Sequence, residues 1–387
     1  HKVTGVQTCA LPISTMRKMM NIVLAAVLWL VGAGTLCAQD KDKERTFTAQ
    51  DSLNYCMKQA QKALLAQRPE VAYRWYRRAV RYDSPSACLA LGNCYYFGYG
   101  TPCDYDKAYR WFYKAAERGN TVAEYSIGRC YYYGRGTHRD GKQAAAWYRL
   151  AAEKGYGMAN FGLGCCYKDG DGVPVNYPKA VELFEKAAAD SLAAAYYMLG
   201  SIYESEREGW TPDARKAFDN FRKAADMDYA KAQYKLGNYY ETGRGCTRDY
   251  AQAKEWYRKA AENGDMDAQY RLGRCYYYGL LDTKPDYGMS FHWLSQAAAQ
   301  SHERAQYHLG VLYQNGEGVK QDDSQAYFWF RRAAEQGYAP GIYRLGRCYL
   351  EGRGVTASEA NAIECFRAAA RLGNSSAKAE LLSLERD

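Results

Sequence analysis

The hydrophobic positions of this chain repeat about every 36 residues. Each copy has a small residue, then Leu or Ile four residues later, then Tyr four residues after that, as in Ala123, Ile127 and Tyr131. Spacings of four place these side chains on one face of a helix, so each copy predicts an amphipathic first helix. The positions that mark the eight copies are Leu91, Ile127, Leu163, Leu199, Leu236, Leu272, Leu309 and Leu345.

Glycines follow the same period at two positions. One comes directly after the Leu or Ile, as Gly128 does, although Gly inside a helix costs about 1 kcal/mol relative to Ala. Its recurrence predicts that another helix passes too close there for a Cβ atom. The other comes seven residues after the Leu or Ile in seven copies, for example Gly134, and predicts the left-handed residue that ends the first helix.

The second half of each copy predicts a second helix. It carries one or two aromatic residues followed by two alanines, as in Trp147-Tyr148 and Ala151-Ala152. Small residues opposite large rings favour two interlocking antiparallel helices, and neither helix can bury its apolar face alone. A period in this range indicates a stack of such pairs. The predicted fold class is all-α, an α-solenoid of about nine antiparallel helix pairs with terminal caps.

The repeated motifs resemble those of the Sel-one-like repeat family, relatives of the tetratricopeptide solenoids. The match is to A-x-x-x-L-G-x-x-Y-x-x-G-x-G and A-x-x-W-[YF]-x-[KR]-A-A-E-x-G, over roughly residues 69–382. The resemblance implies a right-handed superhelix whose concave wall is lined by the first helices. It also implies an adaptor in assembly or signalling, because the motif itself is not catalytic.

The chain divides into an amino-terminal leader region and one repeat domain. Residues 1–15 contain no Met and resemble translated adapter sequence, so we interpret them as a non-native leader. Residues 16–38 predict a signal peptide and residues 39–50 a linker. The predicted parts of the repeat domain are a degenerate N-terminal repeat or cap at 51–85, eight repeats at 86–373 and a C-terminal capping helix at 374–387.

Export to the bacterial periplasm is the predicted localisation. The apolar run at residues 22–36 is too short to cross about 30 Å of hydrocarbon but suits a signal peptide, so we expect no integral membrane span. We expect cleavage after Ala38. Lipidation of Cys37 is an alternative that the bulky Leu36 disfavours.

The net positive charge is small for a chain of this length. The formal charge is +9, and without Lys2, Arg17 and Lys18 the chain has 49 basic against 43 acidic residues, or +6. Together with the predicted export, this argues against a nucleic-acid partner.

Thirteen cysteines in an exported chain raise the question of a disulfide framework. Five of them occupy the position three residues after the Leu or Ile, which carries large hydrophobic residues in other copies. Equivalent helices in a stack lie about 8–10 Å apart, whereas a disulfide needs Cα atoms within about 7 Å. We therefore expect buried free thiols at Cys94, Cys130, Cys166, Cys275 and Cys348.

We find no pattern that predicts catalysis, a metal or a cofactor. A C-x-x-C zinc pattern is absent, and His302 and His308, six residues apart, do not share a helical face. The recurrent G-x-G, such as Gly134-Arg135-Gly136, lacks the Lys and Ser or Thr of a phosphate loop and follows a predicted helix rather than a strand. The chain is therefore predicted not to be an enzyme.

A row of polar side chains is the candidate binding surface. The residues one before and two after each Leu or Ile are three apart, which predicts one exposed strip along the first helix. Arg side chains bind carboxylates in two-point fashion, so an acidic peptide or chain terminus is a plausible ligand. The candidate groove-binding residues, here called the cationic strip, are Arg129, Lys235, Asn238, Arg271, Arg274, Arg344 and Arg347.

Two functional hypotheses follow. The first is an exported, non-enzymatic scaffold that binds a protein or peptide in the concave groove; the sequence predicts no particular oligomeric state. Ordinary surface charge explains the cationic strip equally well. The second is an envelope hydrolase or a cell-wall-sugar-binding protein on the same scaffold, because Tyr and Trp rings stack on sugars. Aromatic residues gathered on one exposed surface would favour the second hypothesis. Rings buried in every repeat would favour the first.

Overall fold

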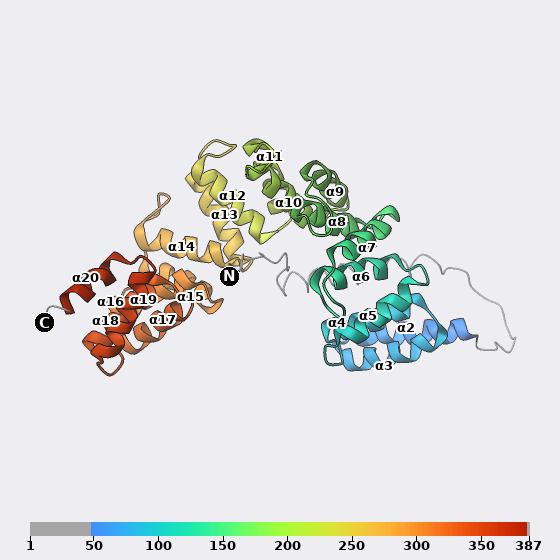
Figure 1. The fold of residues 1–387 in the computed structure, drawn as a ribbon, viewed down its shortest axis with the longest axis horizontal. Coiled ribbons are helices and arrows are strands. Elements are labelled where there is room, and N and C mark those ends of the chain that lie inside the picture. Colours follow the sequence, from blue (N-terminus) through green and yellow to red (C-terminus); the bar gives the residue numbers. More distant parts are fainter. Residues whose placement is uncertain (1–47, 385–387) are drawn as a thin grey trace. The chain divides into compact units, whose positions relative to one another are not determined.

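The computed structural model describes residues 48–384 of the chain. The predicted non-native leader, the signal peptide and nearly all of the linker lie outside the described residues. From residue 53 onward the chain forms one unit, built from the helices shown in Figure 1. Within residues 48–384 there is no β-strand beyond a single bridge between Arg207 and Trp210.

The helices follow one another along the chain with short connections. Their bounds are α2 (Ala49–Leu65), α3 (Pro69–Ala79), the 3-10 turn η1 (Val80–Tyr82), α4 (Pro85–Phe97), α5 (Tyr105–Ala116), α6 (Thr121–Tyr133), α7 (Gly141–Glu153), α8 (Gly157–Asp169), α9 (Tyr177–Ala189), α10 (Ala193–Glu204), α11 (Ala214–Asp226), α12 (Ala230–Thr242), α13 (Tyr250–Glu262), α14 (Met266–Tyr278), α15 (Tyr287–Ala299), α16 (Glu303–Asn315), α17 (Asp323–Glu335), α18 (Ala339–Glu351), α19 (Glu359–Arg371) and α20 (Ser375–Leu384). None of these helices is both long enough and apolar enough to cross a membrane.

Each repeat is a helical hairpin that stacks on the next one. The first helix packs on the second helix of its own repeat, as α6 does on α7, and the second helix then packs on the following first helix, as α7 does on α8. First helices of successive repeats also touch, as α6 and α8 do. At the start of the array, α2 and α3 share a small cluster of Ala60, Ala63 and Ala72. The prediction of an all-α solenoid of about nine repeats is confirmed.

Capping residues decide where these helices begin and end. Most second helices begin after an Asp, Asn or Ser whose side chain accepts a hydrogen bond from the backbone N–H three residues later, as Asp140 does from Gln143 at 3.1 Å. First helices end at a glycine in the left-handed conformation, such as Gly134 with φ of +65°. The predicted glycine terminators are confirmed at Gly98, Gly134, Gly170, Gly243, Gly279, Gly316 and Gly352.

The core of a repeat is one large side chain from the second helix, set against alanines and the Leu-Gly pair. Phe184 of α9 is fully buried and belongs to one cluster with Ala187 and Ala195. A Cβ atom at Gly164 would lie only 2.9 Å from Cε1 of Phe184. The predicted close approach at this glycine is confirmed, but the side chain that leaves no room is mainly this ring rather than the neighbouring helix backbone. The residues that fill the same position in the other full repeats are Phe112, Tyr148, Phe221, Tyr257, Leu294, Phe330 and Phe366.

The second glycine of the G-x-G sequence joins neighbouring repeats. Gly136 has a φ of +74°, and a Cβ atom there would overlap the backbone carbonyl of Tyr105 in the preceding repeat. Glycine therefore lets the loop after α6 lie directly on the first turn of α5. This contact accounts for the recurrence of G-x-G as a packing feature, in agreement with its interpretation as a loop.

The cysteines predicted to be buried are buried and free. All five lie three residues after the Leu or Ile on the packed side of a first helix. Burial raises the pKa of the Cys130 and Cys166 thiols to about 12. These thiols therefore stay protonated at neutral pH and act as small apolar side chains in the core.

Candidate functional site

The side chains of the cationic strip are less exposed in the structure than the sequence predicts. All seven of its residues are half-buried, and the equivalent residues Ser126, His308 and Val311 are buried. The expectation of an exposed strip is therefore wrong for this row. For three of these residues the last turn of the preceding first helix supplies a contact: Tyr96 reaches Arg129, Glu204 reaches Lys235 and Glu241 reaches Arg271.

Two cations of the strip form ion pairs between repeats. Lys235 Nζ lies 2.7 Å from an Oε atom of Glu204, and Arg271 Nε donates to Glu241 at 3.1 Å. Both glutamates stand five residues after the Leu of the preceding repeat. Tyr257 also donates to Glu241, at 2.7 Å, so this carboxylate joins a guanidinium and a phenol. Lys235 and Arg271 thus hold adjacent repeats together, and much of their charge is neutralised.

Arg347 is neutralised in a similar way. Its Nε donates to Glu351 of the same helix at 2.7 Å, and its Nη1 donates to Glu380 of α20 at 3.0 Å. Glu380 also accepts a hydrogen bond from Tyr343 at 3.2 Å. Arg347 therefore connects the last full repeat to the C-terminal helix.

The remaining arginines of the strip have a different environment. The guanidinium carbon of Arg129 lies 5.0 Å from the ring centre of Tyr96, and that of Arg274 lies 5.8 Å and 5.7 Å from the ring centres of Tyr270 and Tyr278. Among residues 48–384, neither arginine forms an ion pair with a carboxylate, and the same holds for Arg344. Within the cationic strip, these three arginines therefore carry the positive charge that no carboxylate of residues 48–384 neutralises.

Asn238, the one uncharged member of the strip, is half-buried on α12. Its backbone carbonyl accepts a hydrogen bond from the Thr242 hydroxyl at 2.8 Å. The strip is thus brought together in space as a row of first-helix residues, but it contains both structural ion pairs and unneutralised arginines. Sequence reasoning missed the carboxylates that neutralise Lys235, Arg271 and Arg347. For Lys235 and Arg271 the sequence signal is a Glu five residues after the Leu of the preceding repeat, which among the eight repeats occurs only at Glu204 and Glu241, whereas the partners of Arg347 do not follow this pattern.

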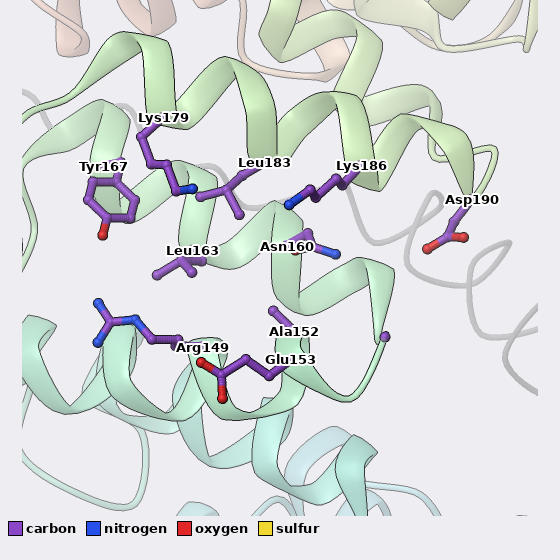
Figure 2. Close-up of a pocket in the computed structure, with 11 residues that line it drawn as sticks. Arg149, Ala152, Glu153, Asn160, Leu163, Tyr167, Lys179, Leu183, Lys186 and Asp190 are labelled. Atoms are coloured by element: carbon purple, nitrogen blue, oxygen red, sulfur yellow. The ribbon is translucent and has the colours of Figure 1, made fainter.

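An open pocket of about 560 Å³ lies between α7, α8 and α9. Figure 2 shows Arg149 entering from α7 and Lys179 and Lys186 from α9, with Leu163 of α8 between them. Both lysines already pair with Glu182, at 2.7 and 2.8 Å. No residue of the cationic strip lines this pocket. The pocket has no convergent set of groups that indicates a reaction.

Two histidines contact the same tyrosine ring, although the sequence places them on different helical faces. His302 is the N-cap of α16 rather than a residue within the helix, and its ring stacks on Tyr270 with centres 4.4 Å apart. The His308 ring lies 5.9 Å from the same tyrosine. Burial, and then the charges of Arg274 and His302, lower the pKa of His308 to about 4. His308 is therefore neutral at physiological pH.

Both ring nitrogens of His302 are engaged within the array, so this side chain is not placed as a catalytic base. Nδ1 of His302 accepts the backbone N–H of Ala305 at 3.2 Å, and its Nε2 lies 3.5 Å from Asp267, so both ring nitrogens have partners within the array. Hydrogen bonding from His302 lowers the pKa of Asp267. In the described part of the chain, no three His, Cys, Asp or Glu side chains are grouped so that they could hold a metal ion.

Comparison with protein families identifies the repeat. The family model described as Sel1 repeat matches nine segments, the first of which is partial. The matched residues are 67–81, 85–120, 121–156, 157–191, 193–229, 230–265, 267–302, 303–338 and 339–374. No curated protein matches the chain.

Two solved structures are similar to the chain over most of its length. One is a protective antigen present in uropathogenic Escherichia coli strains that displays an SLR fold, with 30% identity, 87% of this chain and 72% of that chain covered, and a TM-score of 0.64. The other is a Sel1 repeat protein from Oxalobacter formigenes, with 29% identity, 91% of this chain and 98% of that chain covered, and a TM-score of 0.61. With its family match across nearly all of the described array, the chain belongs to the Sel1 repeat family.

Proposed function

We propose that this chain is an exported, non-enzymatic scaffold that binds a protein or peptide through the cationic strip of its first helices. Sel1 repeats generally form scaffolds for protein–protein interaction. The observation that carries the proposal is that Arg129, Arg274 and Arg344 are half-buried without a carboxylate partner in residues 48–384. An acidic group on a partner would stabilise such a guanidinium by a charge-assisted hydrogen bond. Folding has already removed part of the water around it, so binding adds less desolvation cost.

The distribution of aromatic rings favours a scaffold over a sugar-binding protein or hydrolase. One large side chain of the second helix is buried in each full repeat, a ring in seven of the eight and Leu294 in the other, and Phe112, Phe184 and Phe330 are at most 2% exposed. Each of these rings packs against the Leu-Gly pair of its own repeat, so the rings do not gather on one exposed surface. Stacking on sugars needs exposed ring faces, which these buried rings do not offer.

The decisive experiment reverses only those charges that the fold does not use. Arg271 and Arg347 pair with carboxylates of neighbouring elements, so reversing them would disturb the stack itself. We expect Arg274→Glu with Arg344→Glu to abolish partner capture from periplasmic extract after crosslinking. Circular dichroism and the melting temperature should stay close to those of the unchanged protein.

The matched control reverses two arginines elsewhere. Arg222 of α11 and Arg367 of α19 are exposed on second helices, so Arg222→Glu with Arg367→Glu makes the same change in net charge. This control should capture the partner normally. Capture by the Arg274 and Arg344 double variant at the level of this control would refute the proposal.

The export part of the proposal rests on the sequence of residues 16–38. A fusion of residues 16–50 to alkaline phosphatase without its own signal should give activity, since this reporter folds only in an oxidising compartment. Leu28→Arg places a charge in the apolar run and should abolish that activity. Equal activity of the two fusions would contradict export through this segment.

A further inference from the structure

Two arginines converge on one buried tyrosine at the contact between the first two full repeats. Arg129 lies on α6 and Arg135 in the loop that follows it. Arg135 Nη1 donates to the Tyr96 hydroxyl at 3.1 Å, and Arg129 Nη2 lies 3.5 Å from the same oxygen. Tyr96 is 4% exposed at the end of α4, so it holds both guanidinium groups in place. We call Arg129 and Arg135 the arginine pair.

The positive charge of the arginine pair is not neutralised within residues 48–384, because neither guanidinium forms an ion pair with a carboxylate there. Their other neighbours are rings: the guanidinium carbon of Arg129 lies 5.8 Å from the ring centre of Tyr125, and that of Arg135 lies 5.3 Å from that of Tyr133. Contact with ring faces holds a cation but leaves most of its five N–H donors unused. Two like charges fixed side by side repel each other, so an anion between them would lower the energy of both.

The chain contains a second copy of this arrangement in which an anion is present. Arg347 and Arg353 stand at the same two positions of the repeat that contains α18, again six residues apart. There, Glu351 accepts from Arg347 Nε at 2.7 Å and lies 2.8 Å from Arg353 Nε. The residue of the earlier repeat that corresponds to Glu351 is Tyr133. The same backbone frame thus holds a carboxylate between two arginines in one repeat and offers none in the other.

Aromatic side chains border the arginine pair. Phe97 and Tyr105 are each 37% exposed, and their ring centres lie 4.9 Å and 5.3 Å from that of Tyr96. Arg and Tyr side chains with partly exposed rings are typical of the residues that dominate binding at protein interfaces. The rings offer an apolar contact next to the charge.

We propose that the arginine pair binds a carboxylate of an acidic peptide segment, with Phe97 and Tyr105 contacting an apolar side chain next to it. The chemistry is that of a carboxylate because Glu351 fills the equivalent place in the other repeat. The carboxylate comes from an Asp or Glu side chain or from a chain terminus. This inference rests on the proposed peptide-binding function and assigns it a specific site.

Fluorescence anisotropy with a labelled peptide of alternating glutamate and phenylalanine tests the site in the full-length protein. Arg129→Gln with Arg135→Gln should weaken binding about tenfold or more, as expected for loss of charge-assisted hydrogen bonds. Tyr133→Glu introduces the internal carboxylate of the other repeat and should weaken binding to a similar extent. Tyr133→Gln, the matched neutral change, should bind within about twofold of the unchanged protein.

Two forms of the peptide, one with a free C-terminal carboxylate and one with a C-terminal amide, identify the source of the carboxylate. If the free acid and the C-terminal amide bind equally, the carboxylate is a side chain; if the amide alone fails, it is the chain terminus. An amidated peptide with glutamine in place of every glutamate contains no carboxylate. If it binds as tightly as the glutamate peptide, the proposal is overturned, and unchanged affinity of the arginine-pair variant for the glutamate peptide would overturn it as well. Arg222→Glu with Arg367→Glu, which lies outside the cationic strip, should leave this peptide affinity unchanged. Failure of the arginine pair is measured by peptide affinity, whereas failure of the proposed function is measured by partner capture with the Arg274 and Arg344 double variant, so the two outcomes are distinguishable.

Discussion

His308 provides a sharp test of how closely successive repeats pack. Its side chain is 8% exposed, between α14 and α16, and burial lowers its pKa to about 4. The unfolded chain protonates the same imidazole near its ordinary pKa of about 6.5. Between these two values the unfolded state binds a proton that the folded state does not, so stability falls as pH falls through this window.

The size of the effect follows from the two pKa values. One pKa unit corresponds to about 1.4 kcal/mol, so the full loss by pH 4 is about 3 kcal/mol, of which about 2 kcal/mol is lost by pH 5. Above pH 6.5 the contribution is constant. Other groups titrate in the same range, including Asp265, whose pKa burial raises to about 6. Their effects cancel when two variants that differ only at position 308 are compared.

His308→Met is the suitable variant, because Met198 occupies the equivalent position of another repeat. Hydrogen–deuterium exchange of α16 amides, corrected for intrinsic rates at pH 7 and pH 5, reports the free energy of local opening. We expect the unchanged protein to lose about 2 kcal/mol more than the variant between these pH values. If both lose the same amount, His308 is not held neutral by burial, and the packing described for α14 and α16 is wrong.

Three further predictions concern the core, the contacts between repeats and the thiols. Phe184→Ala removes a fully buried ring and should cost about 3–5 kcal/mol in urea unfolding; a loss below about 1 kcal/mol would contradict its central place. Gly136→Ala should lower the melting temperature clearly more than Gly155→Ala. Both glycines have positive φ, but only Gly136 contacts the backbone of the preceding repeat. Equal losses in melting temperature would argue against that contact. Maleimide labelling followed by mass spectrometry should modify the exposed Cys103 in the native protein, whereas Cys130, whose pKa burial raises to about 12, should react only after denaturation; rapid native labelling of Cys130 would show that the core is open.

The elements of the array were predictable because they depend on residues close together in the sequence. The four-residue spacing of small residue, Leu and Tyr defines the packed face of a first helix, and a glycine such as Gly134 ends it within the same turn. Even the close approach at Gly164 could be anticipated, since glycine within a helix needs a reason. The identity of the obstructing atoms could not be, because Phe184 lies twenty residues later and its rotamer depends on the packed hairpin.

The candidate site was predicted only as a row of positions. The row of first-helix residues follows from the repeat period. The period does not predict, however, that Arg271 and Arg274, three residues apart on one helix, differ in whether a carboxylate neutralises them. Arg271 pairs with Glu241 from the preceding repeat, whereas Arg274 lies on tyrosine rings. That difference depends on how the last turn of one first helix meets the middle of the next.

The sequence by itself therefore determined the helix pairs, the glycine ends of seven first helices and the repeat family. Only the tertiary structure decided which charges are neutralised, that His302 and His308 meet at Tyr270, and that Arg129 and Arg135 share Tyr96 without an acidic partner among residues 48–384. The physical reason is distance along the chain. Helix formation and capping act over a few residues, whereas burial and ion pairing join side chains some thirty residues apart whose register is set by stacking.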